Sequence, residues 1–276
     1  SGRTERHKED RTHGRRVQTP ACNKISKMKK KIIRLHHTDS TNTYLSRYAG
    51  DSDDDMVVVT ADYQSKGRGQ GINTWESEDG KNLLFSMLVR PTGVEAENQF
   101  VLSMAEALAL KEAIDSVISQ GCGGEEVRLK WPNDIYWRDY KISGTLIETT
   151  LCGKTIKTCI FGTGIDVNQT VFRSEAPNPL SLCSIVGTQI DREALLESIV
   201  TCFEHYYQMA VDHSYDRIAD AYKAALYRRT GMHRYADRNG EFCAEIKDVA
   251  LNGTLTLQTD TGETRHYAFK EVKFII

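Results

Sequence analysis

Two patterns of hydrophobic residues alternate along this chain, and together they predict a sheet covered by long helices. Short runs rich in β-branched and aromatic residues predict buried strands at 31–36, 56–60, 82–89, 127–131, 134–137, 142–149 and 155–162. Apolar residues at three- and four-residue intervals predict amphipathic helices at 98–119 and 192–212, and 216–226 extends the second helical region. The strands from 127 onward follow one another through tight turns, so we expect a mixed or antiparallel sheet.

Helix-capping residues and turn residues mark further boundaries along the chain. Asp39 or Ser40 precedes a short helix that runs to Tyr48, because short polar side chains cap helix N-termini. From about Arg229 the chain changes to short strands separated by Asn-Gly and Thr-Gly turns, which are typical of a small β-barrel. The pattern therefore predicts an α+β chain with a tail at 1–30, a main domain at 31–227 and a barrel at 228–276.

The first 27 residues are rich in arginine and lysine and almost free of apolar residues. Such a segment cannot offset its ordering entropy by burial, so we expect it to be disordered. A solvated tail, or upstream sequence before a natural start at Met28, is favoured over a nucleic-acid contact.

Composition excludes several classes of protein. The chain has no apolar run long enough for a secretory signal or a membrane span, so a soluble, cytoplasmic protein is expected. Its seven cysteines are scattered and contain no Cys-x-x-Cys pair, which favours reduced thiols over disulfides or zinc.

The most informative motif is the loop Gly67-Arg68-Gly69-Gln70-Gly71, which is followed by Trp75. Alternate glycines let backbone N–H groups approach a ligand, and arginine offers a planar cation for phosphate or carboxylate. The loop is an anion-binding candidate, although glycine-rich loops more often only connect strands.

Three other blocks accompany this loop: Ser40-Thr41-Asn42, then Lys130-Trp131-Pro132-Asn133-Asp134 with Lys141 and Gly144 behind it, then Gly162-Thr163-Gly164-Ile165-Asp166. In this order and spacing they resemble the biotin protein ligase (biotin–[acetyl-CoA-carboxylase] ligase) family, in the form without an N-terminal DNA-binding domain. That family carries STN, GRGRxGRxW, KWPND followed by KxxG, and GxGxN. The resemblance covers roughly 31–276.

The resemblance implies a fold and a reaction. The fold is a mixed sheet with packed helices, as in class II synthetases, followed by an SH3-like barrel. The reaction uses ATP with Mg²⁺ to convert biotin into biotinyl-5′-AMP and then transfers biotin to a lysine of a biotin carboxyl carrier protein. The sequence is compatible with a reaction that needs no enzyme nucleophile, because it has no Gly-x-Ser-x-Gly elbow and no metal-binding histidine pair.

The same resemblance implies roles for individual residues. The catalytic set is Lys141, Arg68 and Asp134. The biotin-binding set is Ser40, Thr41, Asn42, Gln64, Gly144 and Gly162. The ATP- and adenylate-binding set is Arg68, Gly69, Gln70, Trp75, Lys130, Asn133, Lys141, Gly164 and Asp166, and no protein ligand for a metal is assigned. Each also has a plain structural interpretation: Lys141 as a surface cation on a turn, Asn133 and Asp134 as turn caps, Ser40 to Asn42 as a helix cap, and Trp75 as core.

The sequence departs from the family pattern at four positions. Gln70 replaces the second loop arginine, Ile72 a glycine and Asn73 the last arginine, which removes cations from the phosphate end of the loop. Asp166 stands where the family has asparagine, and either residue can accept a hydrogen bond from an exocyclic amine.

Two other functions stay open at this stage. A lipoate or octanoate ligase would have the same fold, and a non-catalytic adenylate- or nucleic-acid-binding regulator would use the basic tail. Nothing before Lys31 has the periodicity of a helix-turn-helix, so we expect no specific DNA binding. A homodimer is neither predicted nor excluded.

Overall fold

A computed structural model of the chain describes residues 28–48, 53–69, 74–119, 126–173 and 178–276. These residues form one seven-stranded sheet in the order β1-β2-β3-β7-β6-β5-β4. The strands are β1 Lys30–Thr38, β2 Met56–Gln64, β3 Leu83–Val89, β4 Arg128–Lys130, β5 Asp134–Trp137, β6 Tyr140–Cys152 and β7 Thr155–Ile165. β1 and β2 are parallel and every other neighbouring pair is antiparallel, so the sheet is mixed, as predicted.

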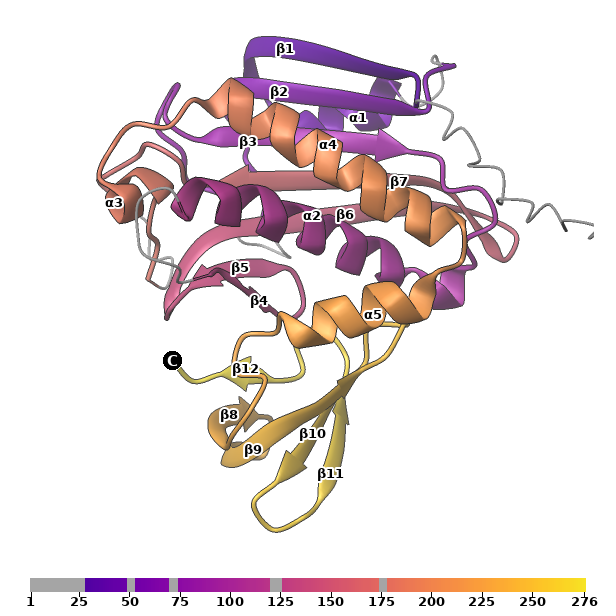
Figure 1. The fold of residues 1–276 in the computed structure, drawn as a ribbon, viewed down its shortest axis with the longest axis vertical. Coiled ribbons are helices and arrows are strands. Elements are labelled where there is room, and N and C mark those ends of the chain that lie inside the picture. The colour runs from indigo at the N-terminus through magenta and orange to yellow at the C-terminus, as the bar shows by residue number, and fades with distance from the viewer. Residues whose placement is uncertain (1–27, 49–52, 70–73, 120–125, 174–177) are drawn as a thin grey trace, which may run out of the picture.

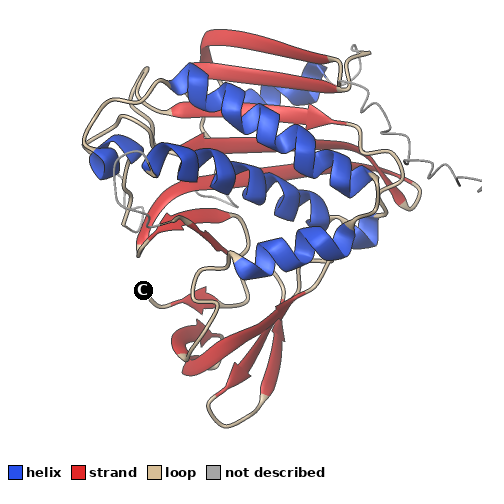
Figure 2. Cartoon of the chain, in the orientation of Figure 1, coloured by secondary structure: helices blue, strands red, loops and turns tan. Residues whose placement is uncertain are grey.

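Two long helices cover one face of this sheet and one short helix covers the other (Figure 1). α2 Phe100–Ile118 and α4 Arg192–Val211 lie side by side across the first face, as Figure 2 also shows. α1 Thr41–Tyr48 follows β1 and lies on the opposite face. The described chain also contains α5 Tyr215–Ala224, the short α3 Leu182–Val186 and the 3-10 turn η1 Ala96–Asn98.

The core explains why the central strands read as continuous apolar runs. Every residue of β3 is buried, because helices cover both faces of the sheet there. Phe85 and Phe161 belong to the large cluster beneath α2 and α4, whereas Val57, Val59 and Leu88 pack with Leu45 of α1. Residues of even number on β7 therefore share the α1 face.

The C-terminal segment forms a second, five-stranded antiparallel sheet in the order β11-β10-β9-β8-β12. Its strands are β8 His233–Asp237, β9 Gly240–Val249, β10 Leu255–Thr259, β11 Thr264–Tyr267 and β12 Lys273–Phe274. Gly240, Gly253 and Gly262 have φ values of 118°, 91° and 85°, a conformation that favours glycine, so the turn residues were correctly identified. The sheet is consistent with the SH3-like barrel that the resemblance implied.

Some sequence predictions fall outside the described residues. These include the basic tail at 1–27 and the loop positions Gln70, Ile72 and Asn73. Within the described part, no helix is long and apolar enough to cross a membrane, and the five cysteines there are free thiols.

Candidate active site

The site is built around two glycines of β7 that face away from α2 and α4. Gly162 and Gly164 are two residues apart and therefore point to the same side of the sheet. A Cβ on Gly162 would lie 2.0 Å from Asn42 Oδ1, and a Cβ on Gly164 would lie 2.4 Å from Cε2 of Trp75. Only glycine lets these two side chains lie directly on the sheet. We call the surface over Gly162 and Gly164 the glycine strip.

A buried polar cluster lies at the Gly162 end of the glycine strip. Gln64 Oε1, at the end of β2, accepts from Thr41 N at 2.7 Å and from Thr41 Oγ1 at 3.0 Å. Ser86 Oγ donates to Asn42 Oδ1 at 2.6 Å and lies 2.7 Å from Thr41 Oγ1. The structure thus brings together Thr41, Asn42, Gln64 and Gly162, which the resemblance assigned to biotin.

Ser86 is a member of this cluster that the sequence analysis missed. It pairs with Gly162 across β3 and β7 and is fully buried. The available signal was a single hydroxyl inside the apolar run of β3, where an unpaired polar group would be costly.

The two other residues assigned to biotin are Ser40 and Gly144, and their contact with biotin stays a prediction. Ser40 is the residue before α1: its carbonyl oxygen accepts from Tyr44 N at 2.9 Å and its N–H donates to Asp39 Oδ1 at 2.7 Å. Gly144 lies on β6 opposite Gly164, and a Cβ there would be 3.1 Å from the Nζ of Lys141. Ser40 therefore starts the helix, and Gly144 belongs to the lysine end of the glycine strip.

At that end, one carboxylate lies between two lysines. Lys141 Nζ is 2.6 Å from Asp134 Oδ1, and Lys130 Nζ is 3.8 Å from Asp134 Oδ2. The hairpin of β5 and β6 makes this possible, because it pairs Asp134 with Gly144, three residues from Lys141. Burial lowers the pKa of Lys130, and the nearby cations add to this while Asp134 opposes it.

The turn that carries Asp134 is supported from two sides. Asn133 Nδ2 donates to the carbonyl oxygen of Thr145, whose own N–H donates to Asn133 O at 3.0 Å. Trp131 Nε1 donates to Gly253 O of the second sheet at 3.0 Å, and its ring packs on Phe269. Asn133 thus stabilises the turn, and its contact with the adenylate stays a prediction.

Trp75 lies beside the lysine end. Its N–H donates to Gly67 O at 3.1 Å, and its ring centroid is 5.8 Å from Lys141 Nζ. Its Nε1 is buried and makes no hydrogen bond within the described residues. This indole therefore offers a free donor at the surface where the resemblance puts the adenylate.

Arg68 lies at the other end of the site. Its guanidinium forms two hydrogen bonds with Glu148 Oε1 and Oε2, at 3.1 and 3.0 Å, and Asn42 Nδ2 donates to Glu148 Oε2 at 2.8 Å. Glu148 is four residues beyond Gly144 on β6, roughly 14 Å at about 3.4 Å per residue. The structure does not bring Arg68 to Lys141, and Glu148 is a second residue that sequence analysis missed.

Asp166 is buried deeply at the end of β7. Its Oδ1 accepts from Asn82 Nδ2 at 3.0 Å, while Asn82 Oδ1 accepts from Val167 N at 3.1 Å. Burial raises the pKa of Asp166 well above its ordinary value, which Lys141 only partly opposes. Asparagine, which the family pattern has here, would offer the same Oδ1 acceptor, and the contact of Asp166 with adenine stays a prediction.

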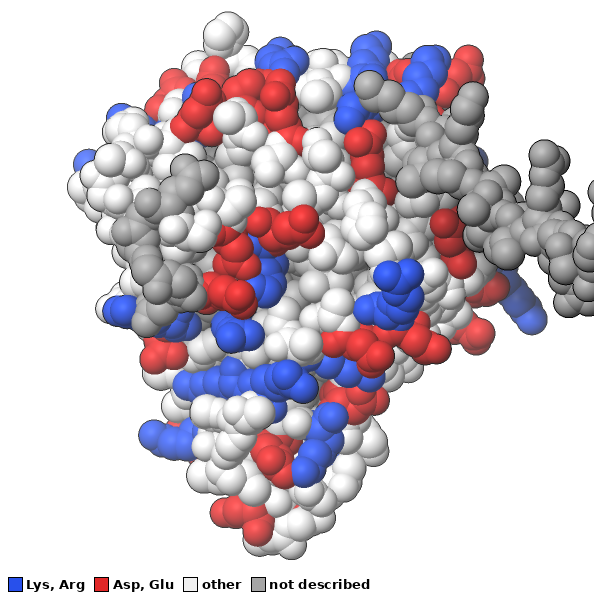
Figure 3. Space-filling model, viewed as in Figure 1, with Lys and Arg blue, Asp and Glu red and all other residues white. Residues whose placement is uncertain are grey.

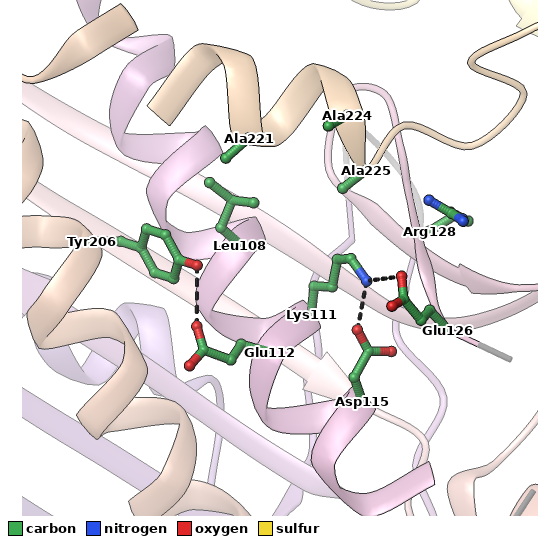
Figure 4. Close-up of a pocket in the computed structure, with 10 residues that line it drawn as sticks. All are labelled: Leu108, Lys111, Glu112, Asp115, Glu126, Arg128, Tyr206, Ala221, Ala224 and Ala225. Carbon is green, nitrogen blue, oxygen red and sulfur yellow. Dashed lines mark hydrogen bonds and ion pairs between the residues drawn. The ribbon is translucent and has the colours of Figure 1, made fainter. Parts of the chain in front are cut away.

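The remaining surface offers little competition for this site. The part of the chain that the structure describes has no group of three or more His, Cys, Asp or Glu residues placed to hold a metal ion. A hollow between α2, α4 and α5 is lined by charged side chains that pair with each other: Lys111 with Asp115 and Glu126, and Tyr206 with Glu112 (Figure 4). None of these residues belongs to the motifs that the resemblance assigned to ligands, so the glycine strip is the stronger candidate.

Comparison with known proteins agrees with this geometry. The sequence model of the "Biotin/lipoate A/B protein ligase family" matches residues 35–166. The "Bifunctional ligase/repressor BirA" of Bacillus subtilis is 28% identical over 235 residues, which cover 83% of this chain and 70% of that protein. The "Biotin--[acetyl-CoA-carboxylase] ligase" of Paracoccus denitrificans is 26% identical, over 83% of this chain and 94% of that protein.

A solved structure confirms the fold. The biotin protein ligase from Aquifex aeolicus "in complex with biotin and ATP" superposes with a TM-score of 0.72 at 24% identity, over 89% of this chain and 99% of that one. The α+β architecture and the family resemblance predicted from the sequence are both confirmed. Residues 35–166 of this chain thus match the biotin/lipoate A/B protein ligase family, and the chain has the fold of a solved biotin protein ligase.

Proposed function

We propose that this protein is an ATP-dependent biotin protein ligase that forms biotinyl-5′-AMP and transfers biotin to a lysine of a carrier protein. The observation that carries the proposal is the Lys141–Asp134 pair, 2.6 Å apart, beside the glycine strip. The names of the relatives, which include biotin–[acetyl-CoA-carboxylase] ligases, support the same activity.

In the first step, a carboxylate oxygen of biotin attacks the α-phosphorus of ATP and pyrophosphate leaves. Two anions must meet, so the site has to supply positive charge where negative charge develops. Lys141 is held in place by Asp134 and can shift its hydrogen bonds from that carboxylate to the reacting oxygens. The second lysine, Lys130, keeps the local charge positive when this happens.

In the second step, the amine of the carrier lysine attacks the acyl carbonyl and AMP leaves. The attacking amine must be neutral and must lose a proton as the amide bond forms. Once Lys141 has moved to the phosphate, Asp134 is the carboxylate that can accept this proton. Both roles of Asp134 are part of the proposal.

Mg²⁺ would arrive with ATP rather than reside in the protein. Magnesium usually takes one or two protein carboxylates together with phosphate oxygens and water. Asp134 is paired with Lys141 and Lys130 and is assigned as the proton acceptor, so no protein ligand is assigned to the ion, and the described residues provide no preformed cluster of carboxylate, histidine and cysteine ligands. The chemistry that the ion supplies is neutralisation of the phosphate charge.

The matched family includes lipoate ligases, so a lipoate or octanoate ligase is the second candidate. The buried cluster of Thr41, Asn42, Gln64 and Ser86 argues against it. A ureido ring offers N–H donors and a carbonyl acceptor, which such a cluster can satisfy. An octanoyl chain offers neither donors nor acceptors, so it would gain no hydrogen bond from this cluster, whose members otherwise bond to one another.

A non-catalytic regulator that binds nucleic acid is the third candidate. A nucleic-acid surface usually gathers Lys and Arg along one face. On the face that carries α2 and α4, positive and negative side chains are interspersed (Figure 3). The carrier protein as partner and the absence of specific DNA binding stay predictions, and the oligomeric state stays open.

The experiment is pyrophosphate release by the purified chain with ATP and Mg²⁺, with biotin, lipoate or octanoate as the acid. Biotin should support turnover and the other two acids should not. Lys141→Ala should lose about 3 kcal/mol of transition-state stabilisation, a factor of more than about 100 in rate. Lys157→Ala is the matched control, because Lys157 is an exposed lysine on the same sheet. Turnover with octanoate alone, or near-normal turnover by Lys141→Ala, would contradict the proposal.

A further inference from the structure

Glu148 holds two of the residues that were assigned to ligands. One oxygen accepts from Asn42 Nδ2 at 2.8 Å, and both oxygens accept from Arg68, at 3.1 and 3.0 Å. The two bonds come from Nη1 and Nη2, so Glu148 occupies the end-on edge of the guanidinium, which an anionic ligand could also use. In this structure the loop arginine therefore already has an anion, and that anion belongs to the protein.

The position of Glu148 on the sheet makes this pairing relevant to a ligand. Glu148, Leu146 and Gly144 lie on the same face of β6, and their partners on β7 are Ile160, Gly162 and Gly164. Glu148 is thus two residues beyond the Gly162 end of the glycine strip. The backbone of the loop lies between the two ends: a Cβ on Gly67 would be 3.7 Å from Gln64 Nε2, and Trp75, whose N donates to Gly67 O, covers Gly164 with its ring.

The Arg68–Glu148 pair is suited to exchange. The side chains of Arg68 and Glu148 are 45% and 39% exposed, and such an ion pair contributes only about 0–1 kcal/mol to stability in water. A ligand carboxylate has the same charge and the same two-oxygen geometry as Glu148. Arg68 can therefore change partner without a net loss of charge pairing, while Asn42 continues to donate to Glu148.

We propose that Glu148 is a specificity-determining residue. It pairs with Arg68 before the ligand binds, and Arg68 then exchanges Glu148 for the carboxylate of the bound acid. This proposal rests on the proposed function, because biotin is the acid considered. Glu148 then competes with biotin's carboxylate for one guanidinium. The competition weakens binding of the acid and leaves binding of a neutral derivative unaffected.

The test is calorimetric titration of the full chain with biotin, with neutral biotinamide and with ATP alone. Glu148→Gln keeps an oxygen for Asn42 and removes the competing charge. It should strengthen biotin binding about threefold to fivefold, the range of an exposed ion pair, and change biotinamide binding less than about twofold. Arg68→Gln should abolish the preference for the acid, and Glu148→Gln should have no further effect in the Arg68→Gln background. Thermal melting of each variant checks that it is folded.

Each other outcome overturns the proposal in a recognisable way. Equal effects of Glu148→Gln on biotin and biotinamide would mean that Glu148 only positions Asn42. Tighter ATP binding with unchanged biotin binding would mean that a phosphate, and not the carboxylate, draws Arg68 away. If the wild-type chain binds neither biotin nor biotinamide, the proposed function itself is wrong. If the wild-type chain binds biotin but Glu148→Gln has the same preference for biotin over biotinamide as the wild type, only this proposal is wrong.

Discussion

Glu106, in the middle of α2, should make the protein lose stability as the pH rises through neutrality. Its side chain is buried under the sheet, where its Oε1 accepts from Thr163 Oγ1 at 2.8 Å and from Thr145 Oγ1 at 3.0 Å. Burial raises the pKa of Glu106 from its ordinary value of 4.5 to about 7, and the two hydroxyl hydrogen bonds oppose this only in part. The folded protein therefore keeps a proton that the unfolded chain releases.

The sign and size of the effect follow from this difference in pKa. Below pH 4.5 both states are protonated, and the contribution of the neutral carboxyl group to stability is fully present. Between pH 4.5 and about 7 the unfolded chain is deprotonated and the folded protein is not, so the free energy of unfolding falls as the pH rises. At about 1.4 kcal/mol per pH unit, the loss amounts to about 3 kcal/mol and is complete once the pH exceeds the folded pKa.

Glu106→Gln tests this, because glutamine keeps the shape and an acceptor oxygen but does not titrate. Urea unfolding at pH 4.5, 6 and 8 gives the free energy of unfolding of each protein. The value for Glu106→Gln minus that for the wild type should increase by about 3 kcal/mol from pH 4.5 to pH 8. Glu112, an exposed carboxylate on the same helix, supplies the control: Glu112→Gln should differ from wild type by less than about 0.5 kcal/mol at each pH. Parallel pH curves for wild type and Glu106→Gln would refute the reasoning.

Three further predictions concern the site itself. Gly164→Ala places a methyl group 2.4 Å from the Trp75 ring and should displace it, which would lower biotin-dependent pyrophosphate release at least about tenfold while circular dichroism stays unchanged. Asp166→Asn should stay within about 1 kcal/mol of wild type in urea unfolding at pH 6, because asparagine keeps the Oδ1 acceptor for Asn82, whereas Asp166→Ala should cost about 1–3 kcal/mol because one N–H of Asn82 Nδ2 loses its acceptor while the other still donates to Gln169. A chain that ends at Tyr227 lacks the Gly253 carbonyl that accepts from Trp131, so it should biotinylate a carrier domain more slowly than the full chain even where circular dichroism shows it folded; an equal rate would contradict a role for the second sheet.

The elements of the fold were largely predictable because their signals are local. Burial of one face imposes a period of two on strands and of three to four on helices, and turn glycines separate the C-terminal strands. α3 was missed because its five residues are too few to show a period. The pairing of β3 with β7 was not predictable, since the pattern identifies buried positions and not the strand that will lie beside them.

The site was predictable only as far as its residues form motifs. Thr41, Asn42 and Lys141 stand in recognisable blocks, and the structure gives each a place at the glycine strip. Ser86 and Glu148 lie within strands, where a polar residue normally indicates only a solvent-facing position. Only the register of β3, β6 and β7 places them at the glycine strip.

The partner of the Arg68 side chain could not be predicted from the sequence for a different reason. A long side chain on an irregular loop can reach several partners, and the sequence does not indicate which anion is nearest. The resemblance put Arg68 and Lys141 in one catalytic set, and the structure pairs Arg68 with Glu148 at the other end of the glycine strip. A motif therefore identifies which charges a site contains, whereas the tertiary structure decides which of them face each other before the ligand arrives.

The two sheets are coupled at the turn that carries Asp134. Lys130 lies 5.0 Å from the centroid of the Phe274 ring in β12, and Trp131 is held by Gly253 and Phe269. Asp134 follows these residues directly, and its carboxylate fixes Lys141. Movement of the second sheet would therefore displace the carboxylate and the lysine together, because both are positioned through the same short turn. This gives the small sheet a mechanical connection to the lysine end of the site.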